Sequence, residues 1–334
     1  MKVMRHFHFI ALLVILLHQA GFGQIEKQAQ VGFRFLENPV SAAAIGRGGY
    51  GITNLHNAAA VFWNPAGLGR VSSRVDAGVD YYRGFADINQ TSIAVALKGT
   101  YGAIALSAII MDYGDLYGTR LPLRGEDATQ GYVETGTFTI NASAFGIGYG
   151  RAVSDRFSFG IHFRLAQQDF GEVYLAHSDS TLSDKQYMLT VPTMDFGASY
   201  DFKVHGITFG AAVMNVSPQV MYEEETFPLP FTMKFGSSVD PFSLLGVELP
   251  SQSLLLGVET RHGRDFGEKV HVGAEYSLYE TFFARVGYMG NYSDKGATFG
   301  IGLHYQGLQF DYALQDYGVL GIIHLLSFGY RTGS

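Results

Sequence analysis

The sequence contains no cysteine, a single tryptophan and few charged side chains. The absence of cysteine excludes disulfide bonds, thiolate metal sites and a cysteine nucleophile. Charged residues make up 16% of the chain, below the roughly 25% that is usual for soluble domains, so there is little material for a water-facing surface. The formal net charge is -7 and no basic block is present, which excludes the electrostatic footprint of a nucleic-acid-binding protein.

The sequence also lacks an apolar run of about 18 residues or more, the length that suggests a transmembrane helix. The apolar run 9–17, FIALLVILL, is too short for this purpose. It follows Lys2 and Arg5 and precedes the small residues Gly21 and Gly23, which is the order of a cleavable signal peptide. We therefore predict that residues 1–23 direct export, the alternative being a buried or anchoring helix.

Glycine and aromatic residues are abundant instead, with 42 Gly, 26 Phe and 20 Tyr. After residue 70, apolar residues alternate with small or polar ones, as in FSFGIHFRLA at 157–166. This period of two predicts β-strands with one apolar face. The expected strands number 14 and cover 73–82, 91–98, 101–111, 134–148, 156–166, 191–201, 206–214, 231–239, 253–262, 269–277, 282–289, 297–305, 307–314 and 321–331.

The expected connections alternate between long and short, with 240–252 as the exception. Outer-membrane barrels have this asymmetry, because their periplasmic turns are short and their external loops are longer. The sequence therefore predicts an all-β fold, a transmembrane antiparallel β-barrel of about 14 strands in the outer membrane. The outer connections are expected at 83–90, 112–133, 167–190, 216–230, 263–268, 290–296 and 315–320.

In a membrane barrel the apolar face of the strands points outward to lipid, whereas in a soluble β-protein it points inward to a core. The apolar face carries bulky Phe and Tyr, and a soluble barrel of 14 strands would enclose a lumen too wide for side chains to fill. We therefore expect lipid outside and small or polar side chains inside. The ionisable residues of the inner face either form paired networks, which we favour, or line a solute path. They are Arg74, Asp76, Asp80, Arg164, Glu259, Arg261, Glu275, Arg285 and Asp311.

Residues 24–70 do not follow the strand pattern and are rich in small residues. Because they precede the first strand, we expect a plug of short helices and loops inside the barrel or at its periplasmic mouth, with the barrel itself at 71–334. We interpret the stretch FWNPAG as an elbow between plug and barrel, in which proline fixes the backbone and the aromatic residues wedge the plug against the wall. Its residues are Phe62, Trp63, Asn64, Pro65, Ala66 and Gly67.

The stretch 41–68, SAAAIGRGGYGITNLHNAAAVFWNPAGL, resembles the N-terminal signature of the FadL-like outer-membrane barrels and in particular of their PorV/PorQ branch. Short motifs in the later strands agree in order and spacing, among them LPFT at 229–232, GAEY at 273–276, RVGY at 285–288, TFGIG at 298–302 and DYAL at 311–314. The resemblance implies a 14-stranded barrel with an N-terminal plug, and it implies one of two functions. PorV/PorQ proteins act as partners in type IX protein secretion or surface attachment, whereas FadL-like proteins take up hydrophobic small molecules.

The leading hypothesis from the sequence is the PorV/PorQ role, with protein partners of a secretion complex bound through outer loops 112–133, 167–190 and 216–230. The alternative is a FadL-like channel for a hydrophobic ligand, which would need an apolar pocket and a break in the wall beside the plug. We expect neither catalysis nor a cofactor. Ser158 and His162 share a face of one strand, but the sequence offers them no acidic partner. The histidines lie on separate strands, so we predict no metal site.

Overall fold

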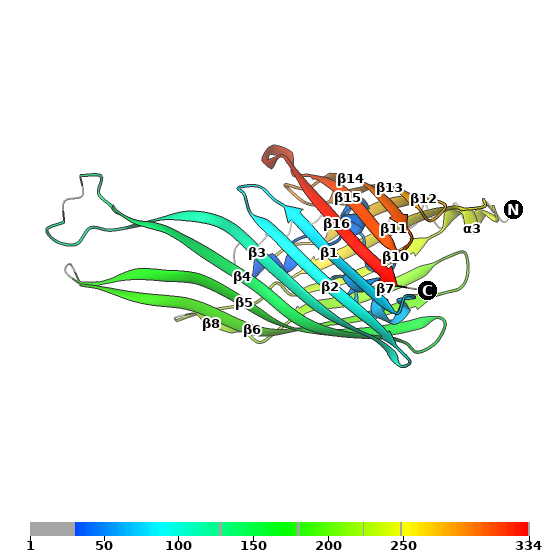
Figure 1. Cartoon of the computed structure of the whole chain (residues 1–334), viewed down its shortest axis with the longest axis horizontal. Helices are drawn as coiled ribbons and strands as arrows, with labels where there is room; N and C mark the ends of the chain where they lie inside the picture. The colour runs from blue at the N-terminus through cyan, green and yellow to red at the C-terminus, as the bar shows by residue number, and fades with distance from the viewer. Residues whose placement is uncertain (1–30, 127–128, 179–180, 223, 248, 333–334) are drawn as a thin grey trace.

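The computed structural model describes residues 31–126, 129–178, 181–222, 224–247 and 249–332 (Figure 1). The predicted signal peptide, residues 1–23, and the first part of the predicted plug lie outside these ranges. Within these ranges, no helix has the length and apolar character to cross a bilayer.

Fourteen antiparallel strands form one closed barrel, which confirms the predicted architecture. Each strand pairs with its neighbour in the chain, β7 pairs with β10, and β1 closes the barrel against β16. The strands are β1 Val75–Arg83, β2 Asn89–Gly99, β3 Gly102–Arg120, β4 Val133–Ala152, β5 Phe157–Ser178, β6 Thr181–Asp201, β7 Thr208–Val216, β10 Thr232–Val239, β11 Gln252–Gly263, β12 Lys269–Leu278, β13 Phe282–Gly290, β14 Ala297–Tyr305, β15 Leu308–Asp316 and β16 Ile322–Thr332.

Several of the predicted connections contain regular structure. The predicted outer loops were wrong for almost half of 112–133 and for most of 167–190, because β3, β4, β5 and β6 continue into them. Outside lipid, a hairpin satisfies its backbone by pairing within itself and needs no apolar face, so its strands lack the strict alternation that marks the others. Loop 216–230 contains a small two-stranded sheet, β8 Val220–Tyr222 and β9 Glu225–Phe227, and connection 240–252 contains helix α3 Pro241–Leu245.

The extra strand length forms two separate hairpin arms beyond the barrel rim (Figure 1). Arm 1 comprises residues 113–139 and arm 2 residues 170–190, and β4 and β5 pair with each other only as far as Asn141 and Asp169. Each arm begins at a β-bulge with the sequence Asp-aromatic-Gly. Gly114 and Gly171 adopt φ of 68° and 76°, and the preceding aspartate accepts each glycine N–H. We call the end of the barrel with the arms the outer end.

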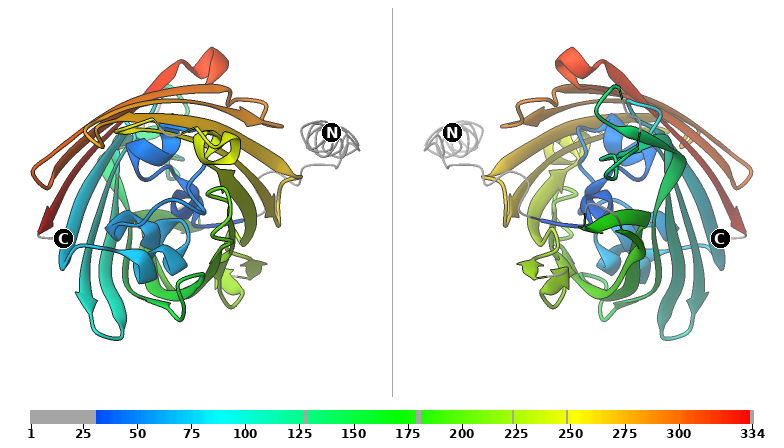
Figure 2. Two further views of the ribbon diagram at one scale, coloured as in Figure 1. Left: turned by 90° about the vertical axis from the view of Figure 1, so that its right-hand side faces the viewer. Right: turned by 90° about the vertical axis from the view of Figure 1, so that its left-hand side faces the viewer.

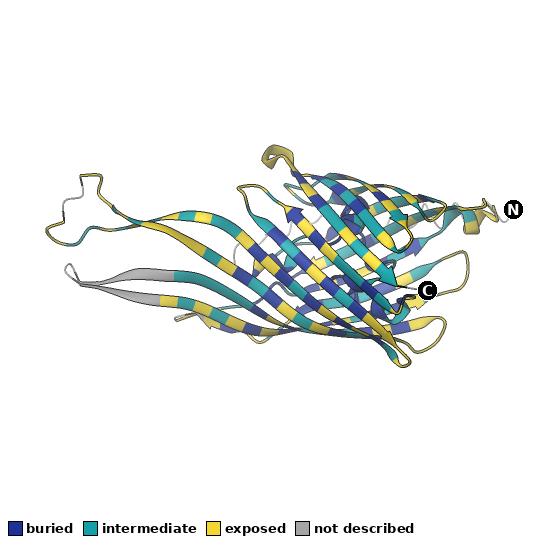
Figure 3. Cartoon of the chain, viewed as in Figure 1, coloured by how far each residue is buried: buried dark blue, intermediate teal, exposed yellow. Residues whose placement is uncertain are grey.

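Exposed and buried residues alternate along the strands of the barrel, as the bands of Figure 3 show. Large apolar side chains remain exposed around the barrel, for example Phe145 at 57%, Phe299 at 55% and Ile301 at 60%. Their inward neighbours in sequence are small, mainly Gly, Ala, Ser and Thr. An apolar outer band of this kind is typical of transmembrane barrels.

The described part of the predicted plug lies inside the barrel (Figure 2). It forms four short helical elements, η1 Arg34–Glu37, α2 Ala42–Gly46, η2 Ala58–Phe62 and η3 Pro65–Arg70. Nearly all side chains from residue 40 to residue 68 are buried. The plug therefore fills the lumen that the 14 strands would otherwise leave open.

Inward-facing glycines seat the plug against the wall. Gly257, Gly273 and Gly287 are register partners on β11, β12 and β13. A Cβ at Gly273 would lie 2.1 Å from the carbonyl oxygen of Arg47, and one at Gly287 would lie 2.0 Å from the backbone nitrogen of Gly48. The plug backbone thus approaches the wall more closely than any side chain would permit, which accounts for part of the high glycine content.

We predict that the substitution Gly287→Ala lowers the free energy of unfolding by about 1–3 kcal/mol, the usual cost of overpacking. The matched control is Gly78→Ala on β1, where the added methyl group would meet only one atom, at 3.6 Å. Thermal unfolding of both variants in detergent measures the difference. Equal stability of the two variants would contradict the close seating of the plug.

Candidate functional site

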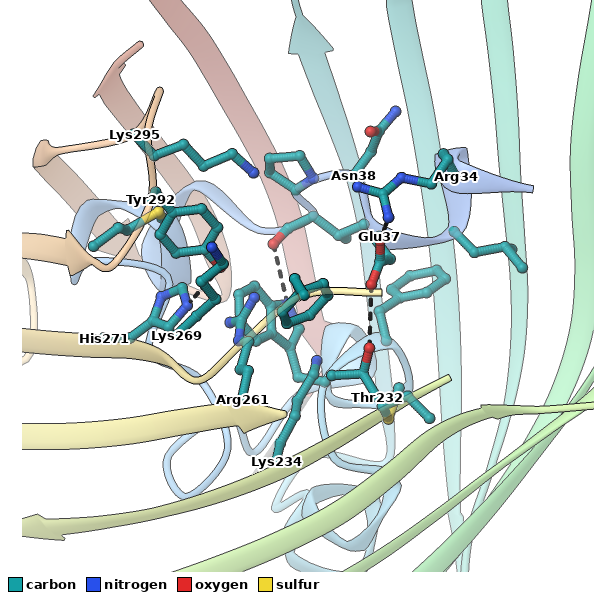
Figure 4. Close-up of a pocket in the computed structure, with 18 of the residues that line it drawn as sticks. Arg34, Glu37, Asn38, Thr232, Lys234, Arg261, Lys269, His271, Tyr292 and Lys295 are labelled. Carbon is teal, nitrogen blue, oxygen red and sulfur yellow. Dashed lines mark hydrogen bonds and ion pairs between the residues drawn. The ribbon is translucent and has the colours of Figure 1, made fainter. Parts of the chain in front are cut away.

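A cavity of about 680 Å³ lies between the plug and the outer end of the barrel (Figure 4). The plug contributes η1, residues 38–40 and Trp63, and the wall contributes side chains from β7, β10, β11 and β12. The loop 291–296 closes one side. The cavity opens to solvent, since the side chain of Arg34 at its edge is 56% exposed.

The only tryptophan borders this cavity. Its indole Nε1 donates a hydrogen bond to the carbonyl oxygen of Val40 at 3.0 Å, which fixes the ring. The Nζ of Lys234 and the Cζ of Arg261 lie 5.0 and 5.1 Å from the Trp63 ring centre, within cation–π range. Trp63 thus links the elbow of the plug to the cationic side of the cavity.

The predicted elbow has its bend at Asn64, between η2 and η3. The Asn64 Oδ1 accepts the N–H of Ala66 at 3.1 Å and so caps η3, whose first residue is Pro65. The Asn64 Nδ2 donates to the carbonyl oxygens of Ile52 and Ala198, at 2.8 and 3.1 Å. One side chain therefore holds two parts of the plug and strand β6 together.

A second glycine row receives the elbow. A Cβ at Gly160 would lie 2.2 Å from the carbonyl oxygen of Pro65, and one at its register partner Gly197 would lie 2.0 Å from the Oδ1 of Asn64. Within the elbow, a Cβ at Gly67 would lie 2.2 Å from a backbone carbonyl oxygen of the plug. The elbow therefore depends on close backbone contact more than on the aromatic wedge that the sequence suggested.

All predicted lumen-facing ionisable residues except Arg74 lie inside the barrel. Arg74 is exposed, just before β1, and makes no ion pair within the described part of the chain. The others form several separate groups rather than one network. Buried are Asp76, Asp80, Arg164, Glu259, Arg285 and Asp311, while the side chains of Arg261 and Glu275 retain 16% and 15% exposure.

The largest of these groups joins the plug to β12, β13 and β15. The Arg285 guanidinium binds Glu275 through Nε and Asp311 through Nη1, the latter at 2.6 Å. Glu275 also accepts a hydrogen bond from Arg47 of the plug at 2.8 Å. Because buried charges are costly without partners, this chain of alternating charges ties the plug to the wall.

Other wall side chains bind the plug backbone directly. Asp76 accepts the N–H of Ala58 at 2.8 Å, and the hydroxyl of Ser327, which also donates to Asp80, accepts the N–H of Ala42. The Thr298 hydroxyl accepts the N–H of Gly48 at 2.8 Å. The Glu259 carboxylate accepts the N–H groups of Gly51 and Ile52 at 3.1 and 3.2 Å. These acceptors satisfy plug N–H groups that the short helical turns leave unpaired.

Sequence reasoning missed a buried Ser–His–Asp relay across the wall. The Ser107 hydroxyl lies 2.8 Å from the Nε2 of His162, whose Nδ1 lies 3.1 Å from Asp195. The expectation that His162 lacks an acidic partner was therefore wrong. A Cβ at Gly146 would lie 2.5 Å from His162 Nε2, so this glycine lets the imidazole reach across β4. The sequence signal for this contact was Gly146 on β4, between Ser107 on β3 and His162 on β5.

This relay has the order of groups of a hydrolase triad, but its surroundings differ. His162 and Asp195 are fully buried, and neither Ser107 nor His162 borders the cavity. The ring of Phe62 packs edge-on against the imidazole, with ring centres 6.2 Å apart. The arrangement therefore joins β3, β5 and β6, and its serine and histidine lie outside the lining of the cavity.

The cavity surface is mainly cationic. Arg34, Arg164, Lys234, Arg261, Lys269 and Lys295 border it, against Glu37, Asp265 and Asp294. Arg34 pairs with Glu37 and Asp265. Arg164 pairs with Asp195 and Arg261 with Glu259, and these two carboxylates do not border the cavity. The Arg164–Asp195 and Arg261–Glu259 pairs therefore present their arginine ends to the cavity.

Comparison with known proteins identifies the fold. Neither a protein-family model nor a curated protein sequence matches the chain. The toluene transporter TbuX of Ralstonia pickettii matches with a TM-score of 0.58 and 13% identity, over 87% of this chain and 98% of that chain. The Pseudomonas putida toluene transporter TodX matches with a TM-score of 0.57 and 9% identity, over 87% and 96%.

A Pseudomonas aeruginosa FadL homologue matches with a TM-score of 0.55 and 12% identity, over 89% of this chain and 99% of that chain. The chain therefore shares its barrel fold with FadL-type transporters. Identities this low establish the fold, and the function has to be argued from the site.

Burial at the cavity edge lowers the pKa of Lys295 to about 8. Between pH 7 and pH 9 its charged fraction falls from about 90% to about 10%, so the cavity becomes less attractive to anions. We predict that quenching of Trp63 fluorescence by iodide weakens over this range, whereas quenching by neutral acrylamide does not change. Lys295→Gln should reduce the pH dependence, and a pH dependence equal to that of the unsubstituted protein would contradict this assignment.

Proposed function

We propose that the protein is a non-catalytic outer-membrane channel that admits small, at least partly hydrophobic compounds to the cavity above the plug. The single observation that carries this proposal is the cavity of about 680 Å³, which opens at the outer end and is closed below by the seated plug. Its volume suits a small-molecule ligand. The fold shared with two toluene transporters supports the same class of function.

Two further features support an outer-membrane location. The apolar band on the outer face of the barrel suits lipid, and the asymmetry between long outer arms and short inner turns is that of outer-membrane barrels. The predicted signal peptide at 1–23 would direct export. It belongs to the proposal and is tested by N-terminal sequencing of the mature chain.

The wall is weakest beside the cavity, between β6 and β7. β7 ends at Val216, which is paired with Met194, and a bulge interrupts the register next to this pair. Beyond Met194, β6 pairs only with β5 in the described chain, and Pro192, which cannot donate to a ladder, lies in this unpaired part. We propose that ligand leaves laterally here, when the loop 217–231 is displaced.

The contacts of this loop with the plug support such a gate. The N–H of Gly32 donates to the carbonyl oxygen of Pro228 at 3.1 Å, and the side chain of Leu229 is buried against the core. Met214 and Asn215, at the end of β7, border the cavity. The loop therefore contacts the plug and follows directly on the strand end where the ladder is interrupted.

We predict that expression of the protein in a Gram-negative host speeds the uptake of radiolabelled toluene severalfold. Met214→Trp should abolish most of this gain, because the larger side chain occupies the cavity. Met233→Trp is the matched control, since Met233 lies on the neighbouring strand β10 and faces outward with 36% exposure. Equal uptake with and without the protein, or equal uptake by both variants, would contradict the channel.

The second candidate is the PorV/PorQ role in type IX-like secretion or surface attachment, and arm 1 favours it. Tyr117 is 87% exposed and Leu121 77% exposed, beyond the barrel rim. The tip is held by Arg120, whose two terminal nitrogens bind Glu126 at 2.7 Å each. A stiff projection with exposed aromatic and aliphatic side chains is suited to protein contact.

We predict for this second role that replacing residues 113–139 with a short turn, in the bacterium of origin, lowers the amount of surface-attached secreted proteins without changing toluene uptake. Quantitative mass spectrometry of the shaved cell surface provides the measurement. An unchanged set of surface proteins would rule out a secretion role for arm 1.

A further inference from the structure

Two lysines on different sides of the cavity have no carboxylate of a described residue within ion-pair distance. Lys234, on β10, is 9% exposed, and Lys295 lies in the loop between β13 and β14. Neither forms a hydrogen bond or an ion pair with any described residue. Their ammonium groups instead lie over aromatic rings, Lys234 5.0 Å from the centre of Trp63 and Lys295 5.0 Å from that of Tyr292.

Both side chains border the same cavity, and Figure 4 shows Lys295 and Lys234 reaching into it from different sides. A buried ammonium group without a carboxylate is costly, whereas cation–π contact recovers only part of that cost. An anionic oxygen placed in the cavity would complete the hydrogen bonding of each lysine.

The rest of the lining favours more than one negative charge. Arg164 and Arg261 present the positive ends of their ion pairs to the cavity, while their carboxylate partners lie outside its lining. Trp63, Phe266 and Tyr292 supply flat apolar surface between the charges. A ligand with a compact dianionic group and an aromatic body matches both features.

We propose that the cavity binds small aromatic molecules that carry two negative charges, such as phosphate monoesters or dicarboxylates, through Lys234 and Lys295. This inference rests on the proposed channel function and adds a charged class of ligand to the neutral compounds of that proposal. Such ligands differ from toluene, the neutral hydrocarbon that the neighbours of the same fold are described as transporting.

The test uses the full chain, purified in a neutral detergent, with Trp63 fluorescence as the readout of binding. Because Trp63 is the only tryptophan and borders the cavity, its signal reports on this site. Four probes separate charge from apolar surface: phenyl phosphate, which carries close to two charges at neutral pH, benzoate with one charge, neutral benzyl alcohol, and inorganic phosphate.

We expect phenyl phosphate to bind about tenfold more tightly than benzoate, as one additional charge-assisted hydrogen bond implies. Inorganic phosphate and benzyl alcohol should both bind more weakly than phenyl phosphate. Benzoate as tight as phenyl phosphate would overturn the requirement for two charges. Inorganic phosphate as tight as phenyl phosphate would overturn the requirement for an aromatic body.

The variants Lys234→Gln and Lys295→Gln should each weaken phenyl phosphate binding about tenfold and leave benzyl alcohol binding unchanged. Lys203→Gln, in an exposed turn at the inner end, is the control for loss of one charge. Lys234→Arg and Lys295→Arg should keep phosphate binding and show that the positions tolerate substitution. Phosphate affinity unchanged in both glutamine variants would overturn the inference.

The outcome also separates this inference from the channel function. If cells take up toluene through the protein but phenyl phosphate does not bind, the dianion site is wrong and the channel stands. If neither toluene uptake nor binding of any probe is detected, both proposals are overturned.

Discussion

A plug enclosed in a barrel must find a hydrogen-bond partner for each of its backbone N–H and C=O groups, because no bulk water reaches them. The plug here consists of short helical turns, which leave many N–H groups unpaired. Asp76, Glu259, Thr298 and Ser327 on the wall accept five of them. The inner face of the barrel is therefore polar chiefly because it serves the backbone of the plug.

This requirement explains the other features of the lumen. Wall side chains reach the plug backbone only if the two approach closely, and the glycine rows on β5–β6 and β11–β13 permit that approach. The charged residues near the plug are neutralised by pairing, as in Arg47, Glu275 and Arg285. Lys234 and Lys295, which border the cavity, make no ion pair with a described residue. The part of the lumen that the plug leaves unfilled is thus the part that can receive a ligand.

The sequence predicted the strands, whose pattern follows from an apolar outer face, and missed the contacts that side chains of the inner face make. Alternation located all 14 strands of the barrel because the outer face must be apolar wherever lipid touches it. It failed for arms 1 and 2, where the strands continue beyond the barrel rim. It identified Glu259 and Asp311 as inward residues, but not their partners, since contacts such as Gly51 with Glu259 join positions about 200 residues apart. The relay of Ser107, His162 and Asp195 was missed because Ser107 and His162 lie on either side of strand β4. They meet only because Gly146 of that strand has no side chain between them.

In the proposed channel, the seated plug closes the lumen below the cavity, so that small molecules pass only by way of the wall. Ion conductance of the intact protein in a planar lipid bilayer tests this most directly. The account predicts insertion without a steady ionic current, because the wall and plug are joined by buried ion pairs and backbone hydrogen bonds. A stable, ohmic conductance through the intact protein would contradict it.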